Sequence, residues 1–445
     1  MAVDPQTGTV YAAGTTYGSP EVYLDVSGNH GQSWAPLAVP SGIAAITGIT
    51  PTPNALYAWN NYIQGSAFVV KMSPDGLTIL YSTYLRGHGG TTKPFPPFAN
   101  QASGIALDAA GNIVVVGESM TADFPIVNAA QPANAGLQDA FVAVISPNGQ
   151  WIDSSSYLGG TANDQAVGVA VDAQGNLIVA GQTQSSEILG TSIPSLHTTR
   201  ELSAAFVAKL AIPVPAITKV VSAASYQPGI ESGSWVMIQG AALAGTTRLW
   251  ESSDFEGGNL PTALDGVSVT IDGIPAYVEY ISPTQINVLA PPDSTTGNVN
   301  VVVNNNGRSS APATAQLQAV APAFFMSPSY NVYASVLPNY TPVTSAAPAH
   351  PGDLVVLWGT GFGPTNPPTI AGTITSGAPA TATPIVTVGR MQVPVISSVL
   401  TTGTVGLYQI TIQLPASVPT GAVTVQASIA GAQTQSGVTL FVAAQ

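Results

Sequence analysis

The sequence predicts an all-β protein of several domains, and three observations lead to that prediction. The chain has 445 residues, which is too many for one ordinary hydrophobic core and suits about three units. It contains 45 Gly and 37 Pro, so long helices are disfavoured and turns are frequent. Hydrophobic residues make up 45% of the chain and recur in short alternating runs, which is the pattern of half-buried strands.

Charged residues make up only 7% of the chain, and the net charge is −13 with nine Lys and Arg. A protein that neutralises nucleic-acid phosphates needs clustered cations, and this sequence has no such cluster, so we expect no nucleic-acid partner. An anionic membrane surface is disfavoured for the same reason. No apolar run is long enough to span a bilayer, so we expect no membrane insertion. The chain has no Cys, which excludes disulfides and Cys-ligated metals.

A hairpin pattern recurs in the first half of the chain. Each copy has a short strand ending in Asp, then a Gly, then a hydrophobic run that ends in Gly, at residues 2–14, 106–117 and 170–181. The Asp can hydrogen-bond the turn backbone, and the Gly supplies the positive φ that closes a tight turn. Further strand runs follow these copies, at Ala67–Lys71, Ala140–Val144 and Ala205–Lys209.

Four short strands per unit, repeated about every 45–65 residues, are typical of β-propeller blades. We therefore predict a partial or small propeller of about four blades over residues 1–211. The last blade lacks an outer strand. The sequence leaves open whether the blades close a ring by themselves or whether a partner or an upstream segment completes it.

The second half of the chain predicts two immunoglobulin-like β-sandwich domains, at 212–320 and 321–445. A stiff Pro-containing linker begins this half, and strands with period-two alternation follow it. The two domains repeat one another. The run Gln285–Val288 corresponds to Gln409–Ile412, and Gly297–Val301 corresponds to Gly421–Val425.

Two stretches of the chain resemble known families. Residues 139–160 and 166–183 resemble the bacterial SBBP-type β-propeller repeat. Residues 225–229, 282–287 and 359–364 resemble a C-terminal domain of secreted proteins from Acidobacteria such as Solibacter, which is related to the IPT/TIG immunoglobulin-like fold. These resemblances imply a secreted or cell-surface protein, and they imply no agreed activity. Met1 is followed at once by strand-like sequence without a signal peptide, so we expect the native start to lie upstream.

No catalytic or metal-binding motif is present. A nucleophile elbow, a His-Glu-x-x-His motif and a Walker loop are all missing, and the four His residues lie far apart in sequence. We therefore predict no cofactor and no metal, although oxygen ligands in the loop at 250–256 leave Ca²⁺ conceivable.

The catalytic candidates are Glu118, Asp123 and His88. Glu118 and Asp123 place two carboxylates near one blade edge, where a pair could perform acid–base chemistry on a glycoside. Both residues also fit solvated or turn-capping carboxylates. Further acids are Asp164 and Glu187, and an esterase would need His88 or His197 as its base.

The ligand-binding candidates lie in two loops. The first loop is an insertion that gathers basic and aromatic side chains: Arg86, His88, Lys93 and Phe95. The second loop pairs Trp250 with Glu251, and an exposed Trp beside acids can stack on a sugar. Both loops also fit ordinary surface loops, the second with one buried aromatic residue.

The leading hypothesis is a non-catalytic extracellular binding or scaffold protein that recognises a glycan or a protein ligand. The alternative is a secreted hydrolase, most plausibly a polysaccharide-directed glycosidase and otherwise an esterase, with acids on the propeller face. The sequence leaves the ligand and the oligomeric state open.

Overall fold

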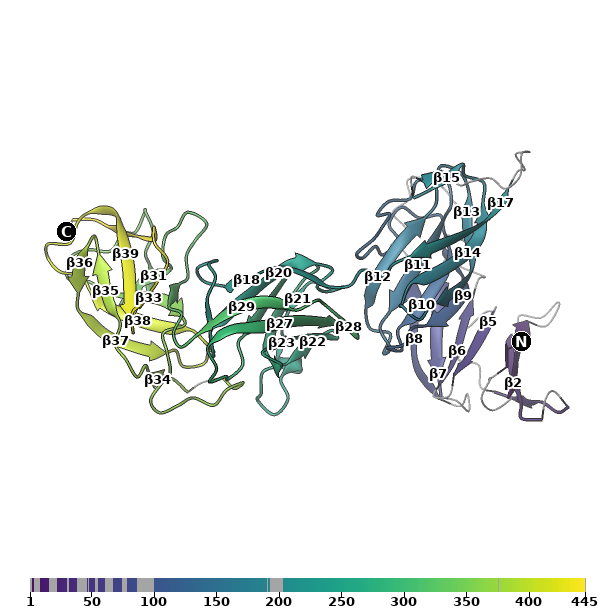
Figure 1. Ribbon diagram of the computed structural model, residues 1–445, viewed down its shortest axis with the longest axis horizontal. Coiled ribbons are helices and arrows are strands. Elements are labelled where there is room, and N and C mark those ends of the chain that lie inside the picture. The colour runs from purple at the N-terminus through teal and green to yellow at the C-terminus, as the bar shows by residue number, and fades with distance from the viewer. Residues whose placement is uncertain are drawn as a thin grey trace. The chain divides into compact units, whose positions relative to one another are not determined.

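The computed structural model comprises two compact units, Met1–Pro213 and Val214–Gln445 (Figure 1). Each unit is described by itself. The residues that the structure describes are 2–3, 9–15, 22–29, 32–37, 46, 48–52, 55–60, 67–73, 78–85, 100–189, 191–192, 203–374 and 376–444.

The chain is all-β, as the sequence predicts. Within the described ranges the regular structure consists of strands and one 3₁₀ turn, η1 (Ser252–Asp254). None of the helical structure described is long and apolar enough to cross a membrane.

Among the described residues, the first unit contains four main antiparallel sheets, whose neighbouring strands follow one another along the chain apart from a small two-stranded sheet inserted in the fourth. The first two sheets consist of β1 (Ala2–Val3), β2 (Val10–Thr15), β3 (Val22–Ser27), β4 (Ala35–Pro36), and of β5 (Gly48–Thr52), β6 (Ala55–Asn60), β7 (Ala67–Met72), β8 (Ile79–Leu85). The third sheet consists of β9 (Asn100–Leu107), β10 (Ile113–Ser119), β11 (Asp139–Ile145) and β12 (Ile152–Leu158). The fourth consists of β13 (Asp164–Val171), β14 (Leu177–Thr183) and β17 (Ala204–Leu210), with a small hairpin of β15 (Glu187–Ile188) and β16 (Thr191–Ser192) inserted before β17.

The predicted Asp–Gly hairpin turns are confirmed in the third and fourth sheets. Between β13 and β14, the carboxylate of Asp172 accepts a 2.8 Å hydrogen bond from the backbone N–H of Asn176, and Gly175 has φ +80°. The turn between β9 and β10 repeats this geometry with Asp108 and Gly111. The Asp therefore has a structural role in these turns, since it fixes the hairpin on which each blade is built.

The four sheets stack face to face, and β10 shows how. Its alternate residues point to opposite faces. Ile113 and Val115 belong to a core shared with the second sheet, whereas Val114 and Val116 belong to a core shared with the fourth. A further core joins the first and second sheets. No core among the described residues joins the fourth sheet to the first, and the arrangement is a partial β-propeller (Figure 1).

A glycine in the second strand of a blade makes room for an aromatic ring in the third strand. A β-carbon on Gly181 would lie 2.2 Å from the carbonyl oxygen of Gln165 and 2.5 Å from the Phe206 ring. Gly117 has the same relation to Phe141 in the third sheet. This Gly-over-Phe packing accounts for Gly117 and Gly181, the glycines that end the hydrophobic run in their two copies.

The second unit contains two β-sandwiches. One sheet of the first sandwich has the strand order β18 (Ala216–Ser222), β20 (Trp235–Ala241), β26 (Gln285–Leu289), β25 (Tyr277–Ile281), β21 (Arg248–Leu249). Its other sheet consists of β19 (Ile230–Glu231), β29 (Ala313–Gln318), β27 (Gly297–Asn305), β23 (Val267–Ile271), β22 (Ala263–Leu264), with β24 (Ile274–Pro275) and β28 (Arg308–Ser309) at its margins.

The second sandwich is built in the same way. One sheet contains β32 (Thr341–Pro342), β31 (Ala334–Val336), β33 (Leu354–Thr360), β38 (Tyr408–Gln413), β37 (Val395–Leu400), β34 (Ala378–Pro379), with β30 (Ala323–Phe324) paired to β33. The facing sheet contains β36 (Met391–Val393), β35 (Ile385–Val388), β39 (Gly421–Ile429), β40 (Ala432–Gln433) and β41 (Thr439–Val442). The central order β20–β26–β25 matches β33–β38–β37, which confirms the internal repeat that the sequence predicts.

Strand β20 is buried on both of its faces. Val236 and Ile238 point into the core of the first sandwich, as period-two alternation requires. Trp235 and Met237 point the other way and are also buried, at 8% and 4% exposed. The outer face of β20 is therefore covered, and residues of the second sandwich contribute to the cover around Trp235.

Candidate ligand-binding cleft

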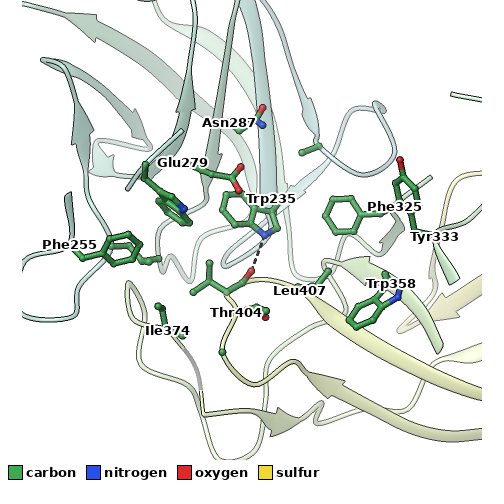
Figure 2. A pocket seen from close by; sticks show the side chains of 15 residues that line it. Trp235, Phe255, Glu279, Asn287, Phe325, Tyr333, Trp358, Ile374, Thr404 and Leu407 are labelled. Carbon is green, nitrogen blue, oxygen red and sulfur yellow. Dashed lines mark hydrogen bonds between the residues drawn. The ribbon is translucent and has the colours of Figure 1, made fainter. Parts of the chain in front are cut away.

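A cleft of about 570 Å³ lies in the second unit, where the outer sheet of the first sandwich meets the second sandwich. Fifteen residues line it (Figure 2). Six of them are aromatic, namely Trp235, Trp250, Phe255, Phe325, Tyr333 and Trp358. The polar side chains among them are Glu279, Asn287 and Thr404.

Two polar residues of the cleft, Glu279 and Asn287, lie on neighbouring strands of the first sandwich. In β26, Ile286 and Val288 point into the core of the first sandwich, so Asn287 between them lies on the outer face. The neighbouring strand β25 carries Glu279 next to a register shift opposite β26. Adjacent strands of one rigid sheet thus hold a carboxylate and an amide at the same wall.

Three aromatic rings of the first sandwich brace one another. The ring centroids of Trp250 and Trp235 lie 5.9 Å apart at an interplanar angle of 64°. Those of Trp250 and Phe255 lie 5.4 Å apart at 59°. Edge-to-face packing of this kind restricts ring motion, so Trp250 is held in place although it follows a strand end.

The second sandwich contributes three further aromatic residues that are tied together through their backbones. The N–H of Phe325 donates to the carbonyl of Trp358 at 2.9 Å, and the N–H of Trp358 donates to the carbonyl of Tyr333 at 3.1 Å. The N–H of Tyr333 donates to the carbonyl of Phe325 at 2.8 Å. In Figure 2 this group lies on one side of Trp235 and Phe255 lies on the other.

Trp235 connects the two walls. Its backbone N–H donates a 3.1 Å hydrogen bond to the hydroxyl of Thr360, and its indole N–H donates to the carbonyl of Val405, both in the second sandwich. The next residue, Gly406, has φ +59°, and a β-carbon there would approach the indole Nε1 to 3.1 Å. The loop therefore needs glycine at this position to reach Trp235.

Glu231 forms a second polar connection between the sandwiches. Its two carboxylate oxygens accept hydrogen bonds from the backbone N–H groups of Ala321 at 2.8 Å and Gly363 at 2.9 Å. The side chain is only 5% exposed, and burial raises the pKa of Glu231 to about 7. Nearby, the hydroxyl of Tyr408 donates to the carbonyl of Gly363.

Among the described residues that line the cleft, Glu279 is the one carboxylate, and none is a Lys, Arg or His. Burial raises the pKa of Glu279, while a hydrogen bond with Asn287 works in the opposite direction. A carboxylate in this setting gains from any ligand group that donates hydrogen bonds or carries positive charge.

Of the predicted binding residues, Trp250 lines the cleft, whereas Glu251 is exposed beside η1 and is not among the lining residues. Arg248 binds two acids of this region, Asp254 at 2.8 Å and Asp265 at 2.9 Å. Because a cation already holds these carboxylates, they are poor ligands for Ca²⁺. No group of three or more His or acidic side chains gathers within the part of the chain that the structure describes.

The predicted insertion with Arg86, His88, Lys93 and Phe95 lies outside the described residues. Its role as a binding loop, and that of His88 as a base, stay predictions.

The two catalytic candidates of the first unit, Glu118 and Asp123, lie in a strand and in the loop that follows it. Glu118 lies in β10, is 8% exposed and accepts a hydrogen bond from the amide of Gln138. Burial raises the pKa of Glu118. Asp123 lies in the loop that follows β10. Burial raises the pKa of the Tyr157 phenol, and the charge of Asp123 acts in the same direction. A catalytic role for the two acids stays a prediction.

The further acids differ in burial. Asp164 is 1% exposed and accepts hydrogen bonds from the backbone N–H of Gly160 and the hydroxyl of Ser185, both at 2.8 Å. Its carboxylate also accepts from the hydroxyl of Thr183. These donors fix the turn between the third and fourth sheets, which is a structural role. Glu187 lies exposed in the short strand β15.

Sequence reasoning missed five of the six aromatic residues of the cleft. Two of them carried a signal, because Trp235 and Trp358 each stand in an unbroken apolar run of a strand, where a one-sided strand would alternate. Such a run indicates burial on both faces, and hence a covering partner for that sheet.

Comparison with known proteins identifies one domain. The profile of the IPT/TIG domain matches residues 220–318, which are the strands of the first sandwich from β18 to β29. This match confirms the predicted IPT/TIG resemblance for that part of the chain. Among curated proteins, none matches the sequence.

Several solved structures are similar over part of the chain. A surface glycan-binding protein from Prevotella bryantii is 14% identical with a TM-score of 0.17, and the match covers 52% of this chain and 43% of that one. A Bacteroides ovatus protein of the mixed-linkage glucan utilization locus, solved with a mixed-linkage heptasaccharide, is 9% identical with a TM-score of 0.27, covering 80% and 67%. The Bacteroides ovatus xyloglucan protein GH43B is 12% identical with a TM-score of 0.26, covering 97% and 75%. This chain thus spans less than half the length of the first of these proteins, and TM-scores this low carry no weight for its function.

Proposed function

We propose that this protein is a non-catalytic carbohydrate-binding protein, and that the aromatic cleft of the second unit is its binding site. The observation that carries the proposal is the combination of six aromatic side chains with the polar pair Glu279 and Asn287 in one cleft.

The chemistry of the cleft suits a sugar. A pyranose ring presents apolar C–H faces and a rim of hydroxyl groups. Rigid aromatic side chains offer flat contact area at little cost in conformational entropy. The carboxylate of Glu279 can accept hydrogen bonds from hydroxyl groups, and the amide of Asn287 can both donate and accept them. Mostly apolar walls with a few placed polar groups are the usual composition of a small-ligand site.

The cleft suits binding better than hydrolysis. Glycosidases use two carboxyl groups about 5–9.5 Å apart on either side of the bond that they cleave. The described lining residues of this cleft include one carboxylate. The alternative, a secreted hydrolase, depends on Glu118 and Asp123 in the first unit and predicts turnover that Glu118→Gln abolishes.

We further infer that the protein works outside the cell or at its surface. In this proposal residues 1–211 form SBBP-type blades, and both sandwich domains, at 212–320 and 321–445, are of the Acidobacteria type. The stacked, rigid sheets of both units support a scaffold that presents loops and clefts for recognition.

The test is a glycan array probed with the full chain, followed by calorimetry on the ligands that bind. Trp250→Ala and Trp358→Ala should each weaken binding about 10- to 30-fold, as loss of an aromatic anchor does. Trp34→Ala is the matched control, because Trp34 is a Trp of the first unit with 41% of its surface exposed. Binding that both cleft variants leave unchanged would contradict the proposal, as would turnover of the bound glycan.

A further inference from the structure

Of the described residues that line the aromatic cleft, one is charged, and it is an acid, Glu279. Glu279 is half-buried, and the Arg248 side chain of the same sheet is engaged by Asp254 and Asp265. No described cation pairs with Glu279. A carboxylate that is partly removed from water without a counter-ion is unfavourable by itself, and a cationic ligand group would relieve that cost.

The aromatic walls of the cleft also favour a positively charged ligand group. The faces of Trp, Tyr and Phe rings carry negative potential, and a cation over such a face gains about 0.5–2 kcal/mol. Three Trp rings line this cleft beside Glu279, and no Lys, Arg or His among the described lining residues opposes them. The net charge of −13 adds a long-range attraction for cations.

The cleft is far larger than a bare ammonium ion requires. A volume of about 570 Å³ accommodates sugar rings, and the walls that contact their apolar faces are in place. We propose that the cleft prefers a glycan with protonated amino groups, namely a hexosamine polymer without its N-acetyl groups, and that Glu279 pairs with the ammonium group. This inference rests on the proposed carbohydrate-binding function.

A neutral sugar offers the competing explanation, because Glu279 can also accept a hydrogen bond from a hydroxyl group. Three β-1,4-linked oligosaccharides of equal length separate the two explanations. Oligomers of glucosamine, N-acetylglucosamine and glucose differ at the second carbon of each ring, which carries an ammonium, an acetamido or a hydroxyl group.

The experiment is calorimetry of the full chain with the three oligomers at low and high salt. We expect the glucosamine oligomer to bind at least about tenfold more tightly than the glucose oligomer at low salt, and the advantage to shrink as salt screens the charge. Glu279→Gln should remove the advantage, so that this variant binds the glucosamine and glucose oligomers with affinities within about threefold of each other. Asn287→Asp adds a second carboxylate and should increase the preference for the glucosamine oligomer over the glucose oligomer. This second variant keeps the test valid if Glu279→Gln folds poorly.

Equal affinity for the three oligomers, or a preference that Glu279→Gln retains, would overturn the inference and leave the proposed function standing. Failure of every carbohydrate to bind would overturn the proposed function, and this inference with it.

Discussion

The indole N–H of Trp235 donates a 2.9 Å hydrogen bond to the carbonyl oxygen of Val405, and this bond joins a strand of the first sandwich to a loop of the second. The same indole packs against Trp250, which lines the cleft. Stability of the second unit and the shape of the cleft therefore depend on one side chain.

Trp235→Phe should destabilise the second unit by about 1–3 kcal/mol, because the Val405 carbonyl, on a residue only 8% exposed, loses its indole donor. Urea denaturation followed by circular dichroism measures the loss. Trp151→Phe is the control, since the indole N–H of Trp151 has no acceptor among the described residues. An unfolding free energy for Trp235→Phe as close to wild type as that of Trp151→Phe would contradict the role of the bond.

Glu231 predicts a pH dependence of stability. Its pKa is about 7 in the folded protein against 4.5 as the ordinary value, so the folded state holds its proton more tightly than the unfolded state does. Between these two values the folded state binds more protons, and the free energy of unfolding must fall as pH rises from about 4.5 to about 7. The fall contributed by Glu231 is at most about 3 kcal/mol.

The measurement for Glu231 is the difference between wild type and Glu231→Gln across that pH range. Other buried acids, such as Glu118 and Glu279, also have raised pKa values, so the wild-type slope alone does not isolate Glu231. Tyr408, whose own pKa burial raises, remains protonated throughout. Glu231→Gln should flatten the slope, and parallel curves for the two proteins would rule out this contribution.

Gly406 has two reasons to resist substitution. Its φ of +59° is strained for any other residue, and a β-carbon would lie 2.5 Å from the Leu289 side chain and 2.9 Å from the carbonyl oxygen of Gly233. Gly406→Ala should therefore cost about 2–4 kcal/mol and weaken ligand binding. Gly403→Ala is the matched control, because Gly403 has φ +75° with open space around it, and it should cost only about 1 kcal/mol. Equal melting temperatures for the two variants would show that the close approach to Trp235 is unimportant.

The Gly-over-Phe packing of the blades gives a prediction for the first unit. Gly181→Ala would force its β-carbon against the Gln165 carbonyl and the Phe206 ring, so we expect a loss of about 1–3 kcal/mol. Gly168→Ala lies in the neighbouring strand with nothing within 4 Å and should be nearly neutral. The measurement is hydrogen exchange of the β14 backbone amides in the two full-length variants. Equal protection of these amides in Gly181→Ala and Gly168→Ala would contradict the packing argument.

The strands and turns could be predicted from the sequence, whereas the cleft could not, and particular residues show why. The Asp172–Gly175 turn and the correspondence of β26 with β38 depend on local pattern and internal repeat, which a sequence displays directly. The cleft depends on which sheet face the second sandwich covers. Period-two alternation indicates that Trp235 and Asn287 share one face of the sheet. No local sequence pattern indicates that Val405 and Trp358 pack against that face. Trp250 was found because its loop combines an aromatic residue with acids.

The measurement that tests the central claim most directly is a titration of the full chain with glycans, followed by tryptophan fluorescence. Three of the six Trp residues line the cleft, so we predict a saturable change in emission that disappears in the double variant Trp250→Ala, Trp358→Ala. The Trp34→Ala control should keep both the change and its midpoint. An emission spectrum that no glycan alters, or a response that survives in the double variant, would contradict a carbohydrate site in this cleft.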